Sequence, residues 1–190
     1  MSSFARFAER LDRAAQQAQP IPQISLEQPF SESEAYDIQA LSLAQRYARG
    51  ERLIGLKLGF TSKAKMEQMG VHDMIWGRLT DQMYLDGGGT LDMDRFIHPR
   101  VEPEICFRVA YDLPWPLRRE DLFDYIDGVA PALEVIDSRY QNFKFSLEDV
   151  IADNCSSAAF VVGPWMSPHT PLANLPISLR VDDQVVQTGK

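Results

Sequence analysis

The stretch VAPALEVIDSR, residues 129–139, is apolar from Val129 to Ile136 except for one acid, Glu134. Short apolar runs bounded by turn residues are typical of buried β-strands. The same texture returns in three other places, at 102–109, 158–162 and 177–181. Helical patterns lie between these runs, near 119–126 and 146–151. The chain from residue 95 onward is therefore expected to be rich in β-strands.

The beginning of the chain has a different texture. Residues 3–17 carry apolar side chains at helical spacing, which predicts an amphipathic helix. A second helix is predicted to run to about Arg49, with Ser31 or Ser33 as its cap and Gly50 as its stop. The first part of the chain is therefore expected to be rich in helices.

The segment that follows is less regular. Residues 53–60, LIGLKLGF, indicate a strand, and a short helix is expected over 63–69. Residues 71–86 are rich in aromatic side chains and are expected to be irregular, and Gly87–Gly89 to form a turn.

These patterns predict an α+β fold with two regions, an α-rich N-terminal or lid region over 1–94 and a β-rich core over 95–190. The last residues, VDDQVVQTGK, indicate a strand followed by a turn. The chain is therefore expected to stop within a hairpin and to lack C-terminal sequence.

Composition excludes several classes of protein. The chain has 190 residues, 45% of them apolar, which is enough to bury a core. A net charge of −8 makes it a poor binder of nucleic acid. It lacks the run of about 18 apolar residues that a membrane span needs. The N-terminus has no signal-peptide core and the two cysteines form no CxxC motif, which favours a cytoplasmic protein with reduced thiols.

Two acids alternate in VEPEI, residues 101–105. Side chains at positions i and i+2 of a strand point to one face, so Glu102 and Glu104 would stand side by side. Like charges held this close repel, and a bound divalent cation removes the repulsion. Oxygen ligands favour a hard ion such as Mg²⁺ or Mn²⁺. The alternative is a solvent-facing edge strand, where Pro103 is also tolerated.

Glu134 is a candidate third ligand because a buried strand rarely carries an unpaired carboxylate. Coordination of the same cation would explain its place in the apolar run. An ion pair with Arg139 or another base is the alternative. Asp137 follows on the opposite face of a regular strand, where Arg139 could pair with it.

Lys57 lies between Leu56 and Leu58, so burial of its ammonium group requires an anion. A substrate carboxylate would supply one, and so would an acid such as Asp81. The alternative is a surface lysine whose ammonium group extends into solvent. The three histidines have no metal-ligand spacing, and His98 is expected to be structural.

Four segments together resemble one known family: residues 55–83 (GLKLGFTSKAKMEQMGVHDMIWGRLTDQM), 98–107 (HPRVEPEICF), 132–154 (ALEVIDSRYQNFKFSLEDVIADN) and 160–164 (FVVGP). They are similar to the hydratase/decarboxylase branch of the fumarylacetoacetase-like superfamily over most of residues 50–190. Within that branch, SKAKMEQMGVHDMIWGRLTDQM resembles the decarboxylase members, whereas hydratases such as 2-oxopent-4-enoate hydratase usually diverge there.

The resemblance implies a distorted β-roll core with a helical N-terminal region, apparently truncated at the C-terminus because family members are longer. It implies Glu102, Glu104 and Glu134 as metal ligands, Lys57 and Asp81 as catalytic residues, and Leu79 as a pocket residue. Arg78, Arg139 and Lys144 are further candidates for binding the second carboxylate of a dicarboxylate substrate.

The activity that the resemblance implies is Mg²⁺-dependent decarboxylation of an unsaturated 2-oxo dicarboxylate, in the meta-cleavage degradation of aromatic compounds. The sister hydratase reaction is the alternative, and a truncated, non-catalytic subunit is a second one. The expected partners are this small substrate, the hydratase that takes the product, and further copies of the chain.

Overall fold

The computed structural model describes residues 2–61, 66–67 and 73–189. Two compact units interleave along the chain. Unit 1 comprises Met1–Tyr84, Gly89–Arg100 and Val135–Ala159, and unit 2 comprises Leu85–Gly88, Val101–Glu134 and Phe160–Lys190. The expected boundary at residue 95 divides the chain once, whereas each unit consists of three segments of the chain. Single strands therefore begin in one unit and end in the other. The helix expected over 63–69 lies largely outside the described residues.

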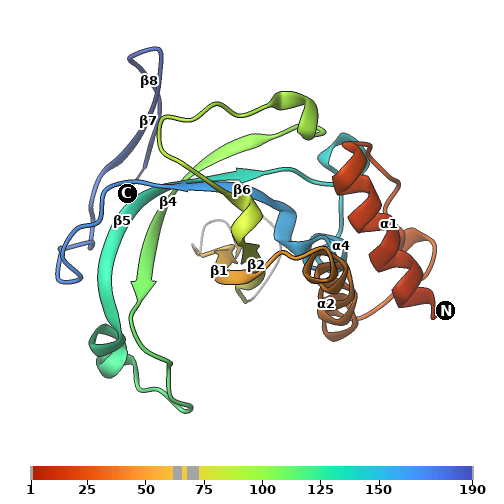
Figure 1. The fold of residues 1–190 in the computed structure, drawn as a ribbon, viewed down its shortest axis with the longest axis horizontal. Coiled ribbons are helices and arrows are strands. Elements are labelled where there is room, and N and C mark those ends of the chain that lie inside the picture. The colour runs from red at the N-terminus through yellow and green to blue at the C-terminus, as the bar shows by residue number, and fades with distance from the viewer. Residues whose placement is uncertain (1, 62–65, 68–72, 190) are drawn as a thin grey trace. The chain divides into compact units, whose positions relative to one another are not determined.

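The first helix of unit 1, α1 (Ser3–Gln17), is the red helix of Figure 1. It is amphipathic as predicted and buries Phe7 and Leu11. Ser2 caps it by accepting a hydrogen bond from the Ala5 N–H at 3.2 Å. Its buried face contributes to one apolar core, whose largest members include Phe7, Ile24, Ile38, Tyr140 and Ile151.

The second helix, α2 (Glu32–Ala48), begins with a capping box in which Ser31 and Glu34 each bond the other's backbone N–H. The structure thus selects Ser31 over Ser33 as the cap. Gly50 follows the helix with φ of +99°, a conformation that glycine adopts without steric cost, and this confirms the predicted stop.

A two-stranded antiparallel sheet completes this part of unit 1. The strand β1 (Leu53–Gly59) is confirmed, and it pairs with β2 (Ile75–Thr80) so that Lys57 lies opposite Gly77. The expectation of irregular structure over 71–86 is wrong for β2 and for β3 (Tyr84–Leu85). IWGRLT has neither strict alternation nor a continuous apolar run, so pairing with β1 supplies the strand order that the local pattern does not show.

The predicted strands of the second half are all present. They are β4 (Arg100–Val109), β5 (Ile126–Ile136), β6 (Ser157–Val162) and β7 (Ile177–Val181). Strands β3, β6, β5 and β4 form one sheet in that order, and β7 pairs with β8 (Gln184–Gly189). The turn of this hairpin is Asp182–Asp183, both with positive φ, so the predicted order of strand then turn for the last residues is wrong.

The remaining elements are short. The helix α4 (Leu147–Ala152) begins with a second capping box, of Ser146 and Asp149. The 3₁₀ segments are η1 (Ile24–Leu26), η2 (Asp81–Met83), η3 (Met93–Arg95), η4 (Arg119–Tyr125), η5 (Gln141–Phe143) and η6 (Asn154–Ser156). These helices and strands confirm the α+β class. No helix of the described chain has both the length and the apolar character needed to cross a membrane.

The segment η6 is unusual because three successive non-glycine residues are left-handed. Asn154, Cys155 and Ser156 have φ of +50°, +52° and +58°. A left-handed conformation costs an L-residue roughly 1–2 kcal/mol, and it normally occurs at single positions. Neighbouring groups must therefore hold this turn in place.

Candidate functional site

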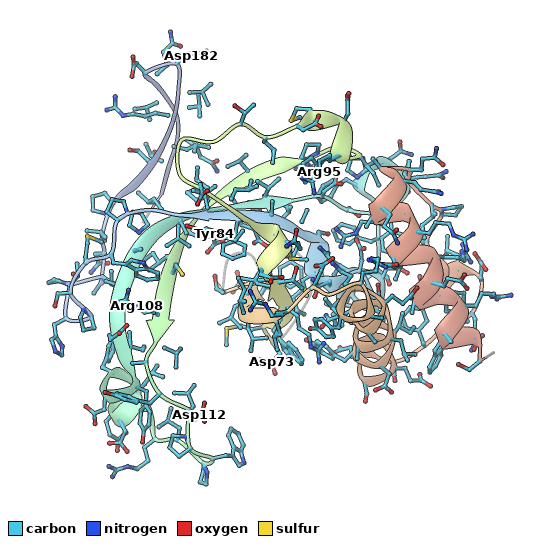
Figure 2. All side chains as sticks on the ribbon, in the orientation of Figure 1. Asp73, Tyr84, Arg95, Arg108, Asp112 and Asp182 are labelled. Carbon is cyan, nitrogen blue, oxygen red and sulfur yellow. The ribbon has the colours of Figure 1, made fainter. Side chains whose placement is uncertain are left out.

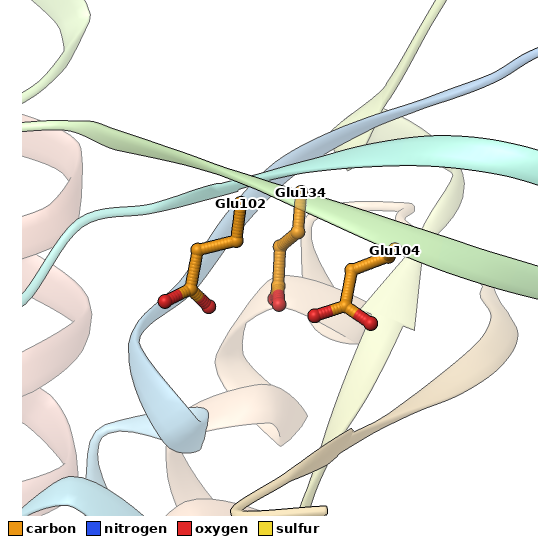
Figure 3. Close-up of side chains that lie close together, drawn as sticks. All are labelled: Glu102, Glu104 and Glu134. Carbon is orange, nitrogen blue, oxygen red and sulfur yellow. The ribbon is translucent and has the colours of Figure 1, made fainter. Parts of the chain in front are cut away.

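Three carboxylates converge in unit 2. Glu102 and Glu104 extend from the same face of β4, two residues apart, and Glu134 extends from β5 toward them (Figure 3). One carboxylate oxygen from each lies within 4.8 Å of the other two. The structure therefore brings together the three acids that the sequence singles out.

The donor set fits a hard divalent cation. Glu134 is buried, with 5% of its surface exposed, whereas Glu102 and Glu104 are half-buried. Carboxylate oxygens alone are the ligands of Mg²⁺, Mn²⁺ and Ca²⁺ rather than of zinc or copper. Three ligands fill half of an octahedral shell, so an ion held by these residues would keep positions for water or a substrate.

The two strands that carry the carboxylate cluster, β4 and β5, contact each other further along in unit 2. Arg108 of β4, labelled in Figure 2, donates to Asp127 of β5 at 2.5 Å. Its guanidinium lies 4.8 Å from the centre of the Trp165 ring. At the strand ends, the Ala110 N–H donates to the Tyr125 carbonyl at 2.8 Å. These contacts fix the partner strands that carry the acids.

Lys57 belongs to unit 1 and is half-buried in β1. Its Nζ donates to the backbone carbonyl of Cys155 at 3.1 Å. Gly55 lies opposite Leu79 in the register of β1 and β2. Residues that lie opposite each other in a sheet share a face, and so do Gly55 and Lys57, which are two positions apart in one strand. The side chains of Lys57 and Leu79 are therefore on one face of this sheet.

Arg78 is on the other face, because Leu56 lies opposite it in the register. Its Nη1 donates to the Gln39 side-chain oxygen at 2.5 Å, and its guanidinium lies 4.7 Å from the centre of the Trp76 ring. The structure therefore separates Arg78 from the face that carries Lys57.

Asp81 pairs with Arg52. The Arg52 backbone N–H and its Nε each donate to the Asp81 carboxylate at 2.9 Å. These bonds, the backbone one first, lower the pKa of Asp81. The carboxylate therefore stays ionised at neutral pH, which suits it to hold a cation and makes it a poor proton donor.

Arg139 is buried, and its guanidinium is engaged within the fold. It forms an ion pair with Asp153, and Nη1 donates to the carbonyls of Asp137 at 2.6 Å and Ser157 at 3.2 Å. Burial raises the pKa of Asp153 to about 6, and the Arg139 charge opposes this rise. The expected pairing of Arg139 with the Asp137 carboxylate is wrong, because that carboxylate accepts backbone N–H groups instead.

The Asp137 carboxylate accepts from the N–H groups of Ile97 at 2.9 Å and His98 at 2.8 Å. The His98 ring lies 5.0 Å from the Phe143 ring, centre to centre. His98 Nε2 is buried and has no hydrogen-bond partner among the described residues, and the structural role of His98 stays a prediction. Lys144, a candidate for binding a second carboxylate, is exposed at the end of η5.

The sequence does not point to the left-handed turn of η6. Its only signal is Asn154, since asparagine tolerates positive φ better than most residues. Cys155 and Ser156 give no such indication.

Comparison with known proteins gives consistent matches. Residues 61–190 match the model of the family described as fumarylacetoacetate (FAA) hydrolase C-terminal. A 4-oxalocrotonate decarboxylase of Pseudomonas sp is 48% identical over 97% of this chain and 72% of its own length. A 2-hydroxypent-2,4-dienoate hydratase of Pseudomonas putida is 37% identical over 84% of this chain and 74% of its own length.

A solved structure of the 4-oxalocrotonate decarboxylase from Pseudomonas putida G7, complexed with magnesium and adipate, superposes with a TM-score of 0.93. It is 37% identical in sequence, and the match covers 98% of this chain and 72% of that one.

Proposed function

The chain belongs to the fumarylacetoacetate hydrolase C-terminal family, and from that premise we propose that it catalyses the Mg²⁺-dependent decarboxylation of 2-oxo-3-hexenedioate (4-oxalocrotonate). The products are 2-hydroxypenta-2,4-dienoate and CO₂, in the meta-cleavage degradation of aromatic compounds. The observation that carries the proposal is the convergence of Glu102, Glu104 and Glu134 within 4.8 Å. Likeness to a decarboxylase that was solved with magnesium and a dicarboxylate supports both the ion and the substrate class.

The reaction needs no organic cofactor because the substrate accepts its own electrons. The bond to the distal carboxylate breaks, CO₂ leaves, and the electron pair moves through the double bond to the 2-oxo oxygen, which takes up a proton. When bound, Mg²⁺, or Mn²⁺ in its place, supplies Lewis-acid polarisation of that oxygen. Glu102, Glu104 and Glu134 hold the ion.

The other predicted residues act on charge. The Lys57 ammonium stabilises negative charge on the substrate. This electrostatic stabilisation is strongest where water is excluded. Asp81, which accepts hydrogen bonds from Arg52, is assigned with Leu79 to the substrate pocket because the family resemblance implies both positions. Lys144 is the better candidate for the distal carboxylate, because the donors of Arg139 already bind Asp153 and backbone carbonyls.

The test is to mix the purified chain with 2-oxo-3-hexenedioate and Mg²⁺ and to measure CO₂ in the headspace. The expected result is one CO₂ per substrate consumed, with loss of activity in a chelator and recovery on addition of Mg²⁺. Glu120→Gln, which removes an exposed acid elsewhere in unit 2, is the matched control and should keep full activity.

The sister hydratase reaction is the second candidate, favoured by the 37% identity to a hydratase. Supplying 2-hydroxypenta-2,4-dienoate separates the two, since a hydratase consumes it without releasing CO₂. A third outcome, no turnover and no linked binding of Mg²⁺ and a 2-oxo acid in calorimetry, would identify a non-catalytic subunit.

The proposal extends to a cytoplasmic location and to association with a hydratase of the same branch and with further copies of the chain. The chemical reason is that the product of decarboxylation is the substrate of hydration. Light scattering coupled to size-exclusion chromatography, with the chain alone and mixed with the hydratase, tests both kinds of association.

A further inference from the structure

We propose that the left-handed turn Asn154–Ser156 positions Lys57, so that its three residues and Arg139 are positioning residues for the reaction. This inference rests on the proposed function, in which Lys57 acts on the substrate. The contact that carries it is the hydrogen bond from Lys57 Nζ to the Cys155 carbonyl at 3.1 Å. Every residue involved belongs to unit 1.

The direction of the Cys155 carbonyl depends on the backbone conformation. Cys155 has φ of +52° and ψ of +38°, between two residues that are also left-handed. A right-handed or extended conformation at these positions would turn the carbonyl away from its present direction. Strained backbone of this kind persists only where the surroundings enforce it, and it is concentrated at functional sites.

Asn154 ties the turn to β2. Its side-chain oxygen accepts the Arg78 N–H at 2.7 Å, and its amide donates to the Arg78 carbonyl at 2.9 Å. The side chain thus pairs with Arg78 as a neighbouring strand would. Because Gly77 lies opposite Lys57, this bond connects the turn to the strand that faces the lysine.

Arg139 holds the two ends of the turn. Its guanidinium donates to the backbone carbonyl of Asp153, before the turn, and to that of Ser157, after it. The Asp137 N–H donates to the Ser156 carbonyl at 2.7 Å. Arg139, a candidate for binding the second carboxylate of the substrate, thus contacts the backbone on both sides of the turn.

Gly77 allows the turn to approach β2 closely. A Cβ atom at this position would lie 2.6 Å from the Asn154 carbonyl oxygen, which is backbone and cannot rotate away. Any side chain at Gly77 would therefore displace the turn.

A carbonyl is a suitable partner for a lysine that must act on an anion. It engages one of the three N–H donors of the ammonium group and carries no formal charge, so this bond restrains the long side chain and leaves N–H donors for other partners. A carboxylate in the same place would compete with the substrate for the positive charge.

The test is a series at Cys155, whose buried side chain can be changed while its carbonyl is kept. Glycine adopts positive φ readily, alanine tolerates it about as well as cysteine does, and β-branched valine disfavours it most. The expected order of kcat is Gly, then Ala, then Val, with valine at least tenfold below glycine and with KM and Mg²⁺ affinity within twofold. A merely structural role predicts that kcat falls only as the folded fraction falls, so urea unfolding of each variant is measured beside its kinetics, and a tenfold loss of kcat in a fully folded valine variant excludes that role.

Gly77→Ala gives an independent perturbation of the same turn. We expect its kcat to fall at least tenfold, since misplacing a reacting group by about 1 Å can cost a hundredfold in rate. Gly87→Ala is the control, because a Cβ there would meet no atom within 4 Å, and its kcat should stay within twofold.

A second measurement separates failure of this proposal from failure of the proposed function. Competitive acetylation with limiting acetic anhydride, followed by mass spectrometry, reports how firmly the Lys57 ammonium is held. Faster acetylation of Lys57 in Cys155→Val than in Cys155→Gly supports the positioning role even if the wild type releases no CO₂. Equal acetylation across the series, or a kcat order of Val, Ala, Gly, overturns it.

Discussion

Replacing Glu134 with glutamine should stabilise the metal-free protein and remove most of the stability that Mg²⁺ adds. Glutamine keeps the shape of the side chain and removes one of three negative charges that lie within 4.8 Å of each other. Without metal, the substitution relieves repulsion. With metal, it removes a ligand. The two effects have opposite signs, so one substitution tests the assignment twice.

The structure sets the size of the first effect. Two unit charges 4.8 Å apart repel by roughly 3.5 kcal/mol at an effective dielectric constant of about 20. Because Glu102 and Glu104 are half-exposed, solvent screening reduces this to about 1 kcal/mol for each pair. Glutamine removes two of the three pairs, so relief of this repulsion can stabilise the metal-free variant by up to about 2 kcal/mol.

Linkage sets the size of the second effect. A ligand at one hundred times its Kd stabilises the folded state by about 2.7 kcal/mol. Loss of a carboxylate ligand should weaken Mg²⁺ binding at least a hundredfold, since even outer-shell changes cost ten- to a hundredfold. At the same Mg²⁺ concentration the variant should then gain only about 0.4 kcal/mol.

Urea unfolding with and without Mg²⁺, together with calorimetric titration of Mg²⁺, measures both quantities. Glu120→Gln changes the net charge equally at an exposed site and should behave as wild type in both conditions. A Glu134→Gln protein that gains as much stability from Mg²⁺ as the wild type, and decarboxylates at the same rate, would show that Glu134 is not a ligand.

Three further predictions concern the fold. Burial raises the pKa of Asp153 from 3.8 to about 6, so the folded state holds this proton more tightly than the unfolded state. The unfolding free energy of wild type relative to Asp153→Asn should therefore fall by about 3 kcal/mol as pH rises from about 4 to 6, in urea titrations, and a flat profile would contradict the buried site. Gly163→Ala places a Cβ 2.9 Å from the Pro131 carbonyl and should cost about 1–3 kcal/mol in thermal unfolding, whereas Gly87→Ala, with open space, should be nearly neutral. Ser31→Ala should cost about 1 kcal/mol by loss of the capping box, and an equal cost for Ser33→Ala would contradict the cap assignment.

Local sequence patterns determined most of the elements. The helices α1 and α2 follow from apolar spacing and capping residues, and β4, β5, β6 and β7 follow from short apolar runs between turns. The alternation of Glu102 and Glu104 predicts a shared face because the strand period is two. Each of these features depends on residues within a few positions of one another, which is why the sequence alone is sufficient.

Pairing between distant segments could not be predicted in the same way. The strand β2 takes its order from β1, and its own sequence lacks alternation. The proximity of Glu134 to Glu102 and Glu104 depends on the pairing of β4 with β5. The family resemblance implied that the three acids bind one metal, but the strand patterns do not show which strands pair.

The role of Arg139 shows the same limit most clearly. From the sequence it is a charged residue beside a candidate ligand, available to Asp137, to Glu134 or to a substrate. In the folded chain it is buried against Asp153 and holds a left-handed turn that itself has almost no sequence signature. A buried charge pairs with the groups that the tertiary structure places next to it. Left-handed backbone persists only when contacts from distant segments offset its free-energy cost. Sequence therefore determined which residues carry chemistry, and tertiary structure decided which of them meet.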